Sequence, residues 1–567
     1  MPTRRERRIE RQKRRRRTAI VATAAACVIA VAAAGVASGR LGHSATRHAA
    51  ALGPQVAPST ARDAAHAHGP PRPTTTAVAA ASLAALDGDY GVTAAWVAAE
   101  NAKPGSGRWK ITGAQDPDGI AGYANLVQAE VGQTLALYVS TRAASFHVEA
   151  YRMGYYQGLG ARLVWSSAQV PGAVQPRCPV APATNMVQCD WRPSLQVTLT
   201  SAWVQGQYLL KLVGSAGEQS YVPLTVWDPS SDATYVIMAG VLTDQAFNSW
   251  GGYDLYQGVG SCAPNVYPCS TRSRVVSFDR PYAAGDGAAS YLSLLYPLTR
   301  FAEQHSLDVT YWTDITLAEQ GSLLQKHRVL ISPGHVEEGS LEMRQAATSA
   351  AEHGVNLIFF GASPILRKVR LEQSPLGADR EMVNYRDPAA DPLHRSDPAQ
   401  VSQNWWGQYP ASSPASELVG ANYVGYYNAG AFPLTVSEPG SWLFAGTGLG
   451  TDAQVPGVLS GDFQAYDPAL GATPAGVEIL AHSRVTITDH PDRRYADTTY
   501  YTLPGSRAGV FSSGTVGWIP SLQDCAPKPG CPARIMQQIT GNLLRVFGAG
   551  PAGAAHPSVA NWKQFYG

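Results

Sequence analysis

The residues best placed to do chemistry follow two short apolar runs near the middle of the chain. His335, Glu337 and Glu338 come just after the first run, and Ser363 and Arg367 come after the second. Imidazole and carboxylate groups can exchange protons with a substrate, and carboxylates also bind metal ions. A second interpretation stays open, because acidic residues also favour the first turn of a helix, where they interact with its dipole.

A strand, a helix and a second strand are expected to position these side chains. Val329–Ile331 is an apolar run closed by Ser-Pro-Gly, and Val355–Phe360 is a second run closed by Gly361. The segment between them has apolar residues at helical spacing and ends at Gly354, a residue type suited to a helix C-terminus. Such a unit predicts two parallel inner strands, and ligands bind beyond the carboxyl ends of strands in open α/β sheets.

Strands and helices alternate along the rest of this half, which predicts a parallel sheet with helices on both faces. Residues 373–468 are rich in Trp and Gly and too long for a plain loop, so we expect irregular insertions packed over the strand ends. The predicted strands are Tyr235–Ala239, Asp308–Trp312, Val477–Thr488, Thr498–Leu503 and Gly509–Ser513, and the predicted helices are Tyr291–His305, Leu317–His327 and Ala533–Phe547.

Residues 101–230 predict a β-sandwich. Apolar and polar residues alternate in short runs, turn-forming Gly, Pro and Ser residues separate the runs, and no helical pattern intervenes. The glycine- and tyrosine-rich connection Arg152–Gly160 fits either a ligand loop or an elaborate hairpin, and the hairpin is favoured. The runs are Leu135–Val139, Phe146–Tyr151, Arg162–Trp165, Val197–Leu199, Tyr208–Leu212 and Tyr221–Val226.

The N-terminus has the pattern of an export signal. Residues 1–17 hold ten Arg or Lys against two Glu, a net of +8, so the remainder carries −6 of the chain's total of +2. Residues 18–39 are uncharged and rich in Ala, Val and Ile, which suits a bilayer-spanning helix. A transmembrane signal anchor is favoured, with a cleaved signal peptide as the alternative. The mildly acidic remainder argues against nucleic-acid binding.

The chain of 567 residues is long enough for several domains. The body is therefore expected outside the cytoplasm, anchored by one helix or secreted if the signal is cleaved. The predicted parts are a basic cytoplasmic segment (1–17), the signal anchor (18–39), a disordered Ala-, Pro- and Thr-rich linker (40–100), the β-sandwich (101–230), the α/β domain (231–550) and a C-terminal tail (551–567).

The cysteines support export. One of the seven lies in the apolar N-terminal segment, and the other six form close pairs around Pro-containing loops. No pair has the C-x-x-C spacing of a metal site, so three local disulfides are the simplest arrangement. The pairs are Cys178 and Cys189, Cys262 and Cys269, and Cys525 and Cys531.

Six motifs run through both predicted domains. They are YRMGYYQGLGARLVW (Tyr151–Trp165), TDQAFNSWGGYDLY (Thr243–Tyr256), SFDRPY (Ser277–Tyr282), SPGHVEEGS (Ser332–Ser340), GVNLIFFGAS (Gly354–Ser363) and TYYTLPGSRAGVFSSGTVGW (Thr499–Trp518). In this order they resemble proteins related to the large (β) subunit of N,N-dimethylformamidase, and the resemblance covers roughly residues 110–550.

The resemblance implies an Ig-like sandwich followed by an α/β domain like that of class I glutamine amidotransferases. It also implies hydrolysis of small linear amides at an iron ion held by two tyrosines and one glutamate. Carried onto this chain by motif, the metal ligands are Tyr256, Tyr282 and Glu337, with His335 and Glu338 as catalytic proton-transfer groups. Phenolate and carboxylate oxygens suit a hard ferric ion.

The chain departs from the family pattern at two places. Phe247 stands in Ala-Phe-Asn where relatives usually have Ala-Tyr-Asn, so a phenol is missing. Residues 334–339 read GHVEEG where relatives usually read GHDEYW, so a second carboxylate and a glycine replace polar and aromatic groups. Both changes fall at the expected metal site.

Two functions of different classes follow. The first is an extracytoplasmic, iron-dependent hydrolase of C–N bonds in linear amides. The second is a non-catalytic, membrane-anchored protein that binds cell-envelope glycans or another protein through exposed aromatic residues. A cysteine nucleophile of the amidotransferase type is excluded, because no cysteine lies between Cys269 and Cys525. Self-association is left open. The aromatic residues are Trp405, Trp406, Tyr409 and Tyr423–Tyr427.

Overall fold

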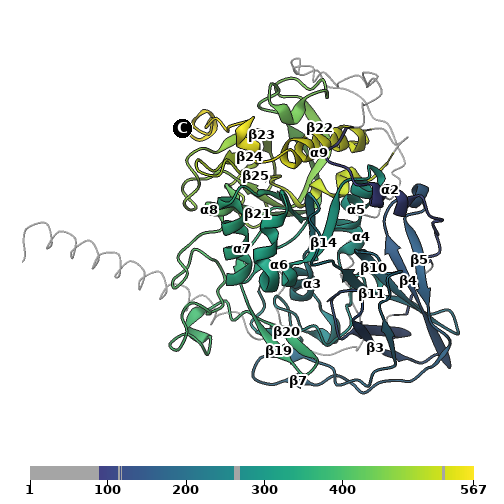
Figure 1. The fold of residues 1–567 in the computed structure, drawn as a ribbon. Coiled ribbons are helices and arrows are strands. Elements are labelled where there is room, and N and C mark those ends of the chain that lie inside the picture. The colour runs from purple at the N-terminus through teal and green to yellow at the C-terminus, as the bar shows by residue number, and fades with distance from the viewer. Residues whose placement is uncertain (1–88, 113–114, 117, 261–267, 526–529) are drawn as a thin grey trace, which may run out of the picture. The chain divides into compact units, whose positions relative to one another are not determined.

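The computed structural model describes residues 89–112, 115–116, 118–260, 268–525 and 530–567 (Figure 1). This part of the chain is mixed α/β. Within these ranges, no helix is long and apolar enough to cross a membrane. The predicted anchor at residues 18–39 lies outside the described residues.

Two sheets form the N-terminal part, and their strands pair antiparallel except for the parallel pair Gln128–Ala129 with Gln219–Val226. Leu135 and Leu137 of the first sheet share one buried apolar cluster with Val148 and Leu210 of the second, as expected for strands with one apolar face. The first sheet has the order β1 (Ile120–Ala124), β3 (Thr134–Thr141), β9 (Leu195–Thr198). The second has the order β2 (Gln128–Ala129), β11 (Gln219–Val226), β10 (Gly206–Gly214), β4 (Ser145–Met153), β5 (Ala161–Ser166), with β6 (Val170–Pro171) beside β4.

The connection between β4 and β5 is a hairpin that contains the short 3-10 helix η1 (Tyr156–Gly158). Arg152 at its start is fully buried, and its Nη2 lies 2.6 Å from Oε1 of Glu303 on α5 (Tyr296–Gln304). Tyr311 donates to the same Oε1 at 2.6 Å. Arg152 at the start of this hairpin therefore joins the N-terminal sheets to the α/β part through a buried ion pair.

A seven-stranded sheet forms the α/β part, and the predicted βαβ unit lies at its centre. Its first five strands are parallel, and the last two pairs are antiparallel, which corrects the expectation of a fully parallel sheet. The connection from β24 to β25 is only six residues, too short for a parallel crossover. The order is β14 (Val309–Thr313), β12 (Tyr235–Ala239), β15 (Val329–Pro333), β17 (Asn356–Phe360), β25 (Gly509–Ser512), β24 (Tyr495–Thr502), β23 (Glu478–Arg484).

Helices cover both faces of this sheet, as predicted (Figure 1). Successive side chains of a strand point to opposite faces, so Ile237 and Ile358 pack toward α5 and α9 (Ala533–Gly548), whereas Val236 and Leu357 pack toward α6 (Asp314–Gln320) and α7 (Leu341–Glu352). Both faces are apolar, which is why the strands are continuous apolar runs in the sequence.

Residues 373–468 are not irregular throughout, which corrects a second expectation. They contain most of the hairpin β19 (Arg370–Ser374) and β20 (Gly377–Val383) and all of the hairpin β21 (Asn422–Thr435) and β22 (Gln454–Ala465). The register of the second hairpin shifts at three places, so its apolar residues do not alternate regularly. Because of this irregularity, the periodicity of the sequence does not predict the hairpin.

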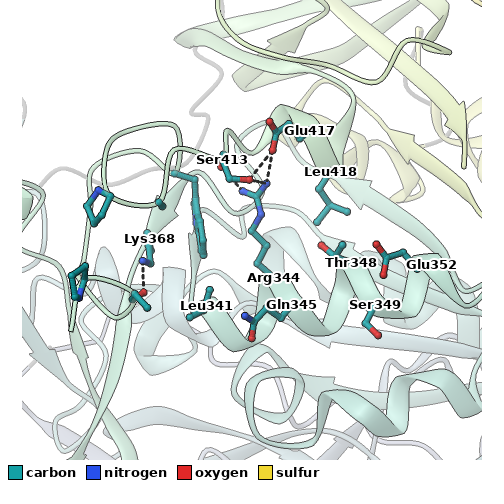
Figure 2. Close-up of a pocket in the computed structure, with 15 residues that line it drawn as sticks. Leu341, Arg344, Gln345, Thr348, Ser349, Glu352, Lys368, Ser413, Glu417 and Leu418 are labelled. Carbon is teal, nitrogen blue, oxygen red and sulfur yellow. Dashed lines mark hydrogen bonds and ion pairs between the residues drawn. The ribbon is translucent and has the colours of Figure 1, made fainter.

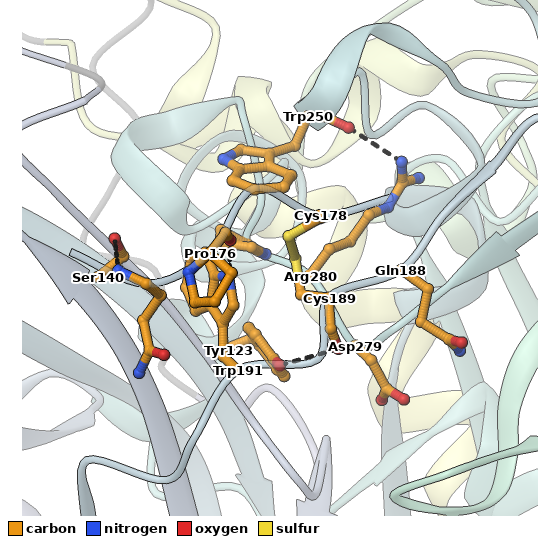
Figure 3. The surroundings of a disulfide bond; sticks show 12 residues. Tyr123, Ser140, Pro176, Cys178, Gln188, Cys189, Trp191, Trp250, Asp279 and Arg280 are labelled. Carbon is orange, nitrogen blue, oxygen red and sulfur yellow. Dashed lines mark hydrogen bonds between the residues drawn. A yellow bond between two sulfur atoms is a disulfide. The ribbon is translucent and has the colours of Figure 1, made fainter. Parts of the chain in front are cut away.

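A disulfide between Cys178 and Cys189 anchors the β7 (Val180–Ala181) and β8 (Met186–Val187) hairpin against the SFDRPY motif (Figure 3). The N–H of Cys189 donates to the carbonyl of Asp279 at 2.8 Å. The second predicted pair, Cys525 and Cys531, is also bonded. Two of the three predicted disulfides are thus confirmed, and the third involves Cys262, which lies outside the described residues.

Candidate functional site

Polar side chains meet beyond the carboxyl ends of β12, β15 and β17. Thr243 comes from α3 (Val241–Ala246) after β12, Glu337 and Glu338 follow β15, and Arg367 follows β17. Gly334 turns the chain into this region: its φ is +59°, and a Cβ there would lie 2.7 Å from Cβ of Leu294. A left-handed, crowded position of this kind requires glycine.

A phenol and two carboxyl groups form the centre of the cluster. Oη of Tyr256 lies 2.7 Å from Oε2 of Glu337 and 2.8 Å from Oε1 of Glu338. The hydroxyl of Thr243 donates to Oε2 of Glu338 at 2.7 Å, and Nε of Arg367 lies 2.8 Å from Oε1 of Glu337. Both glutamates are buried, with 4 % and 1 % of their surfaces exposed. Carboxyl groups so deeply buried need these partners.

His335 joins this cluster to a more exposed aspartate. Its Nε2 lies 3.3 Å from Oε2 of Glu337 and 3.3 Å from Oδ2 of Asp462, which belongs to β22. Neither contact has good hydrogen-bond geometry, so Nε2 has no hydrogen-bond partner among the described residues. Ser363 donates to Oδ2 of Asp462 at 3.3 Å. An imidazole in this position can exchange a proton with a bound molecule.

The surroundings separate the pKa values of the two glutamates. Burial opposes ionisation of Glu337, but the charges of Arg367 and His335 outweigh it and lower the pKa of Glu337 to about 2. Burial and the neighbouring charge of Glu337 raise the pKa of Glu338 to about 7. Burial alone would lower the pKa of His335, yet Asp462 and Glu337 hold it well above its usual value. Divergent pKa values of neighbouring groups are typical of acid–base sites.

Aromatic rings and two arginines enclose Tyr256. The ring of Phe247 stacks on it with centroids 4.1 Å apart and also lies 5.1 Å from the ring of His335. The guanidinium of Arg386 lies 4.4 Å from the centroid of the Tyr256 ring, and that of Arg367 lies 4.5 Å from the ring of Trp405. Burial and the two glutamates raise the pKa of Tyr256 well above its usual value. The phenol is therefore neutral in this environment.

The structure brings together four of the five predicted site residues and leaves Tyr282 outside the cluster. Tyr256, His335, Glu337 and Glu338 are in contact, whereas within the described ranges no hydrogen bond joins Tyr282 to them. Tyr282 instead lines a neighbouring cavity, whose wall includes His335.

The cluster contains Tyr256 and Glu337 from the iron-binding set that the resemblance implies, whereas Tyr282 lines the neighbouring cavity. One oxygen of Glu337 already pairs with Arg367, and Phe247 contributes no phenol. The chemistry of the site is accordingly derived from its own acid and base side chains.

A larger groove lies elsewhere, along the outer face of α7 (Figure 2). It has a volume of about 580 Å³ and contains none of the cluster residues. Arg344 donates to the carbonyl of Ser413 at 2.8 Å, and its guanidinium lies 4.9 Å from the ring of Trp406. Trp406 is only 3 % exposed, so it serves packing here and offers little surface for stacking a sugar.

Two members of the cluster were not identified from the sequence. Asp462 lies on a hairpin 125 residues beyond Glu337, and nothing in its local pattern indicates that β22 returns to the strand ends. Thr243 opens the motif TDQAFNSWGGYDLY, so the resemblance marks its segment but not its contacts with both glutamates. The sequence predicted that Arg367 lies at the end of the second strand, but it assigned no role to this side chain.

One protein family matches the sequence of this chain. The family described as "N,N-dimethylformamidase beta subunit-like, C-terminal" matches residues 147–532, more than half of the chain. The protein therefore belongs to that family. No curated protein matches the chain.

Proposed function

We propose that this protein is a hydrolase of C–N bonds in small linear amides. The observation that carries the proposal is the contact of His335 with Glu337 and Asp462, beside a pair of glutamates with widely separated pKa values. Membership of the N,N-dimethylformamidase-like family supports the same reaction class.

In the proposed reaction, water attacks the amide carbon and Asp462 accepts the proton that the water loses. His335 is kept cationic by its two carboxylate neighbours and donates its Nε2 proton to the leaving nitrogen as the C–N bond breaks. Asp462 then returns its proton to the imidazole. The products are a carboxylic acid and an amine, so atoms and charges balance.

The buried residues orient these two groups. Glu337 fixes the imidazole and is itself held by Arg367 and Tyr256. Glu338 stays protonated up to about pH 7, so the glutamate pair carries one negative charge opposite the imidazolium. One negative charge on this glutamate pair, rather than two, leaves the imidazolium of His335 a stronger acid. This favours proton donation to the leaving nitrogen.

The finer fold and the location are part of the proposal. The two packed, mostly antiparallel sheets and the seven-stranded sheet support an Ig-like sandwich joined to a glutamine amidotransferase-like domain. The two disulfides support an oxidising compartment, as expected for a body exported behind a membrane anchor or a cleaved signal.

The test is release of amine and acid from formamide, acetamide and their N-methyl derivatives by the full chain. His335→Asn is expected to lower kcat by about 100-fold or more, because a positioned general acid contributes at least that much. Glu352→Gln, a substitution of an exposed carboxylate on α7, is the matched control and is expected to retain full activity. Absence of hydrolysis by the folded wild-type chain for every amide would overturn the proposal and favour the envelope-binding alternative.

A further inference from the structure

A small cavity lies where the second N-terminal sheet meets the carboxyl ends of β12 and β15. Its volume is about 50 Å³. Gln207 of β10, Asp244 and His335 are among the residues that line it. One water needs roughly 10–15 Å³ of such volume, so the cavity has room for about three or four waters or one molecule of four to five heavy atoms.

A buried donor of one residue that lines this cavity has no partner. Gln207 is 3 % exposed; its Oε1 accepts from the hydroxyl of Thr225 at 2.9 Å, while its Nε2 makes no hydrogen bond within the described part of the chain. Leaving such groups unpaired is unfavourable, so a molecule that fills the cavity has to offer an acceptor.

Another lining residue, Asp244, offers an acceptor. Ser290 donates two hydrogen bonds to Asp244, from its backbone N–H and from its hydroxyl, and both go to Oδ1. Within the described residues no hydrogen bond reaches Oδ2. A molecule in the cavity therefore meets an N–H donor at Gln207 and a carboxyl acceptor at Asp244. The remaining lining is largely aliphatic, from Leu224 and Leu294 among others.

We infer that this cavity binds the amide group of a small primary or N-monosubstituted amide. The carbonyl oxygen accepts from Gln207, and an N–H of the amide donates to Asp244. An N,N-dialkylated amide has no N–H, so it leaves Asp244 unpaired and is disfavoured. The inference rests on the proposed function, because His335 lies both on the cavity wall and in the catalytic cluster.

The inference also gives the N-terminal sheets a part in substrate selection. Gln207 comes from β10, whereas the catalytic groups come from the α/β part. Sites built to hydrogen-bond a substrate N–H discriminate strongly against analogues that lack it, because a buried polar group is then left unpaired. Selectivity would thus be set across the junction between the two parts of the chain.

The experiment is a ligand-observed NMR titration of the full wild-type chain with acetamide and with acetone. The two molecules have nearly the same shape, and only acetamide carries N–H groups. We expect acetamide to bind at least about tenfold more tightly. Equal binding of the two would overturn the inference, and so would binding of N,N-dimethylformamide as tight as that of N-methylformamide. Neither result depends on turnover, so failure of hydrolysis with selective binding would overturn only the proposed function.

Two variants locate the binding. Asp244→Asn is expected to reduce acetamide affinity about tenfold and to leave acetone binding unchanged, whereas Gln207→Leu removes the donor to the carbonyl oxygen and is expected to weaken the binding of both molecules. Gln345→Leu, on the exposed face of α7, is the control and is expected to bind acetamide like the wild type. Thermal melting establishes that each variant is folded, and unchanged acetamide affinity in both folded cavity variants would overturn the assignment to this cavity.

Discussion

The phenol of Tyr256 contacts two carboxyl groups, at 2.7 Å from Glu337 and 2.8 Å from Glu338. A phenol has one proton, so it can donate to only one of them. Both contacts are satisfied when Glu338 carries a proton and donates to Tyr256, which donates in turn to Glu337. The raised pKa of Glu338, about 7, agrees with this arrangement. A chain of directed hydrogen bonds thus ends at the carboxylate that faces His335.

Glu338→Gln is expected to change how stability depends on pH. The folded-state pKa of Glu338 is about 7, above an unfolded value near 4.3, so the wild type loses stability as pH rises between these values. The variant lacks this titrating group and so lacks this loss. The unfolding free energy of the variant minus that of the wild type should therefore increase by roughly 3 kcal/mol between pH 4 and pH 8. Urea unfolding at several pH values measures it. Parallel curves for variant and wild type would contradict the assignment of the proton to Glu338.

The same titration should appear in the kinetics. Above about pH 7, ionisation of Glu338 places a second negative charge near His335 and makes the imidazolium a weaker acid. We expect kcat/KM to fall as pH rises through about 7. On the acid side we expect no loss from Glu337, whose pKa is about 2, and a loss below about pH 6 only from Asp244, whose pKa burial raises to about 6. A profile that instead rises through pH 7 would show that the working group acts as a base.

Arg367→Met should leave the charge of Glu337 buried without its guanidinium partner. Breaking a buried ion pair on one side costs about 3 kcal/mol or more. The double variant Arg367→Met, Glu337→Gln removes both charges and should recover part of that loss, which denaturant unfolding can measure as a coupling free energy. Additive losses would mean that the 2.8 Å contact contributes no specific stabilisation.

The buried pair of Arg152 and Glu303 should control the docking of the N-terminal sheets. Both side chains are fully buried, so Glu303→Gln leaves an uncompensated guanidinium and should destabilise the protein by about 3–5 kcal/mol. Glu352→Gln serves as the exposed control. Equal melting temperatures for the two variants would show that this pair does not hold the two parts together.

Much of the α/β sheet could be predicted because its strands are short apolar runs closed by turn residues. Tyr235–Ala239 is predicted with the bounds that the structure has, and β15 and β17 differ from prediction by only a few residues. Their order along the chain also placed Glu337 and Glu338 at the strand ends. Local patterns suffice where an element is buried on both faces.

The remaining features depend on contacts between distant segments. The bulged hairpin that carries Asp462 shows no clear periodicity in the sequence. The position of Tyr282, which lies in a loop, depends on packing against distant segments that local sequence patterns do not predict. The family resemblance predicted Tyr282 as a neighbour of Glu337 at the strand ends. In the structure the ring stacked on Tyr256 is Phe247, which the sequence analysis noted only as a lost phenol.

The most direct test of the central claim measures amide hydrolysis and iron content on the same preparation of the full chain. We predict hydrolysis of acetamide or N-methylformamide at an iron content well below one per chain, abolished in His335→Asn and retained in Glu352→Gln. Hydrolysis that is absent from iron-poor protein and returns in proportion to added iron, with a tyrosinate-to-iron absorption band, would contradict the acid–base mechanism derived from His335 and Asp462.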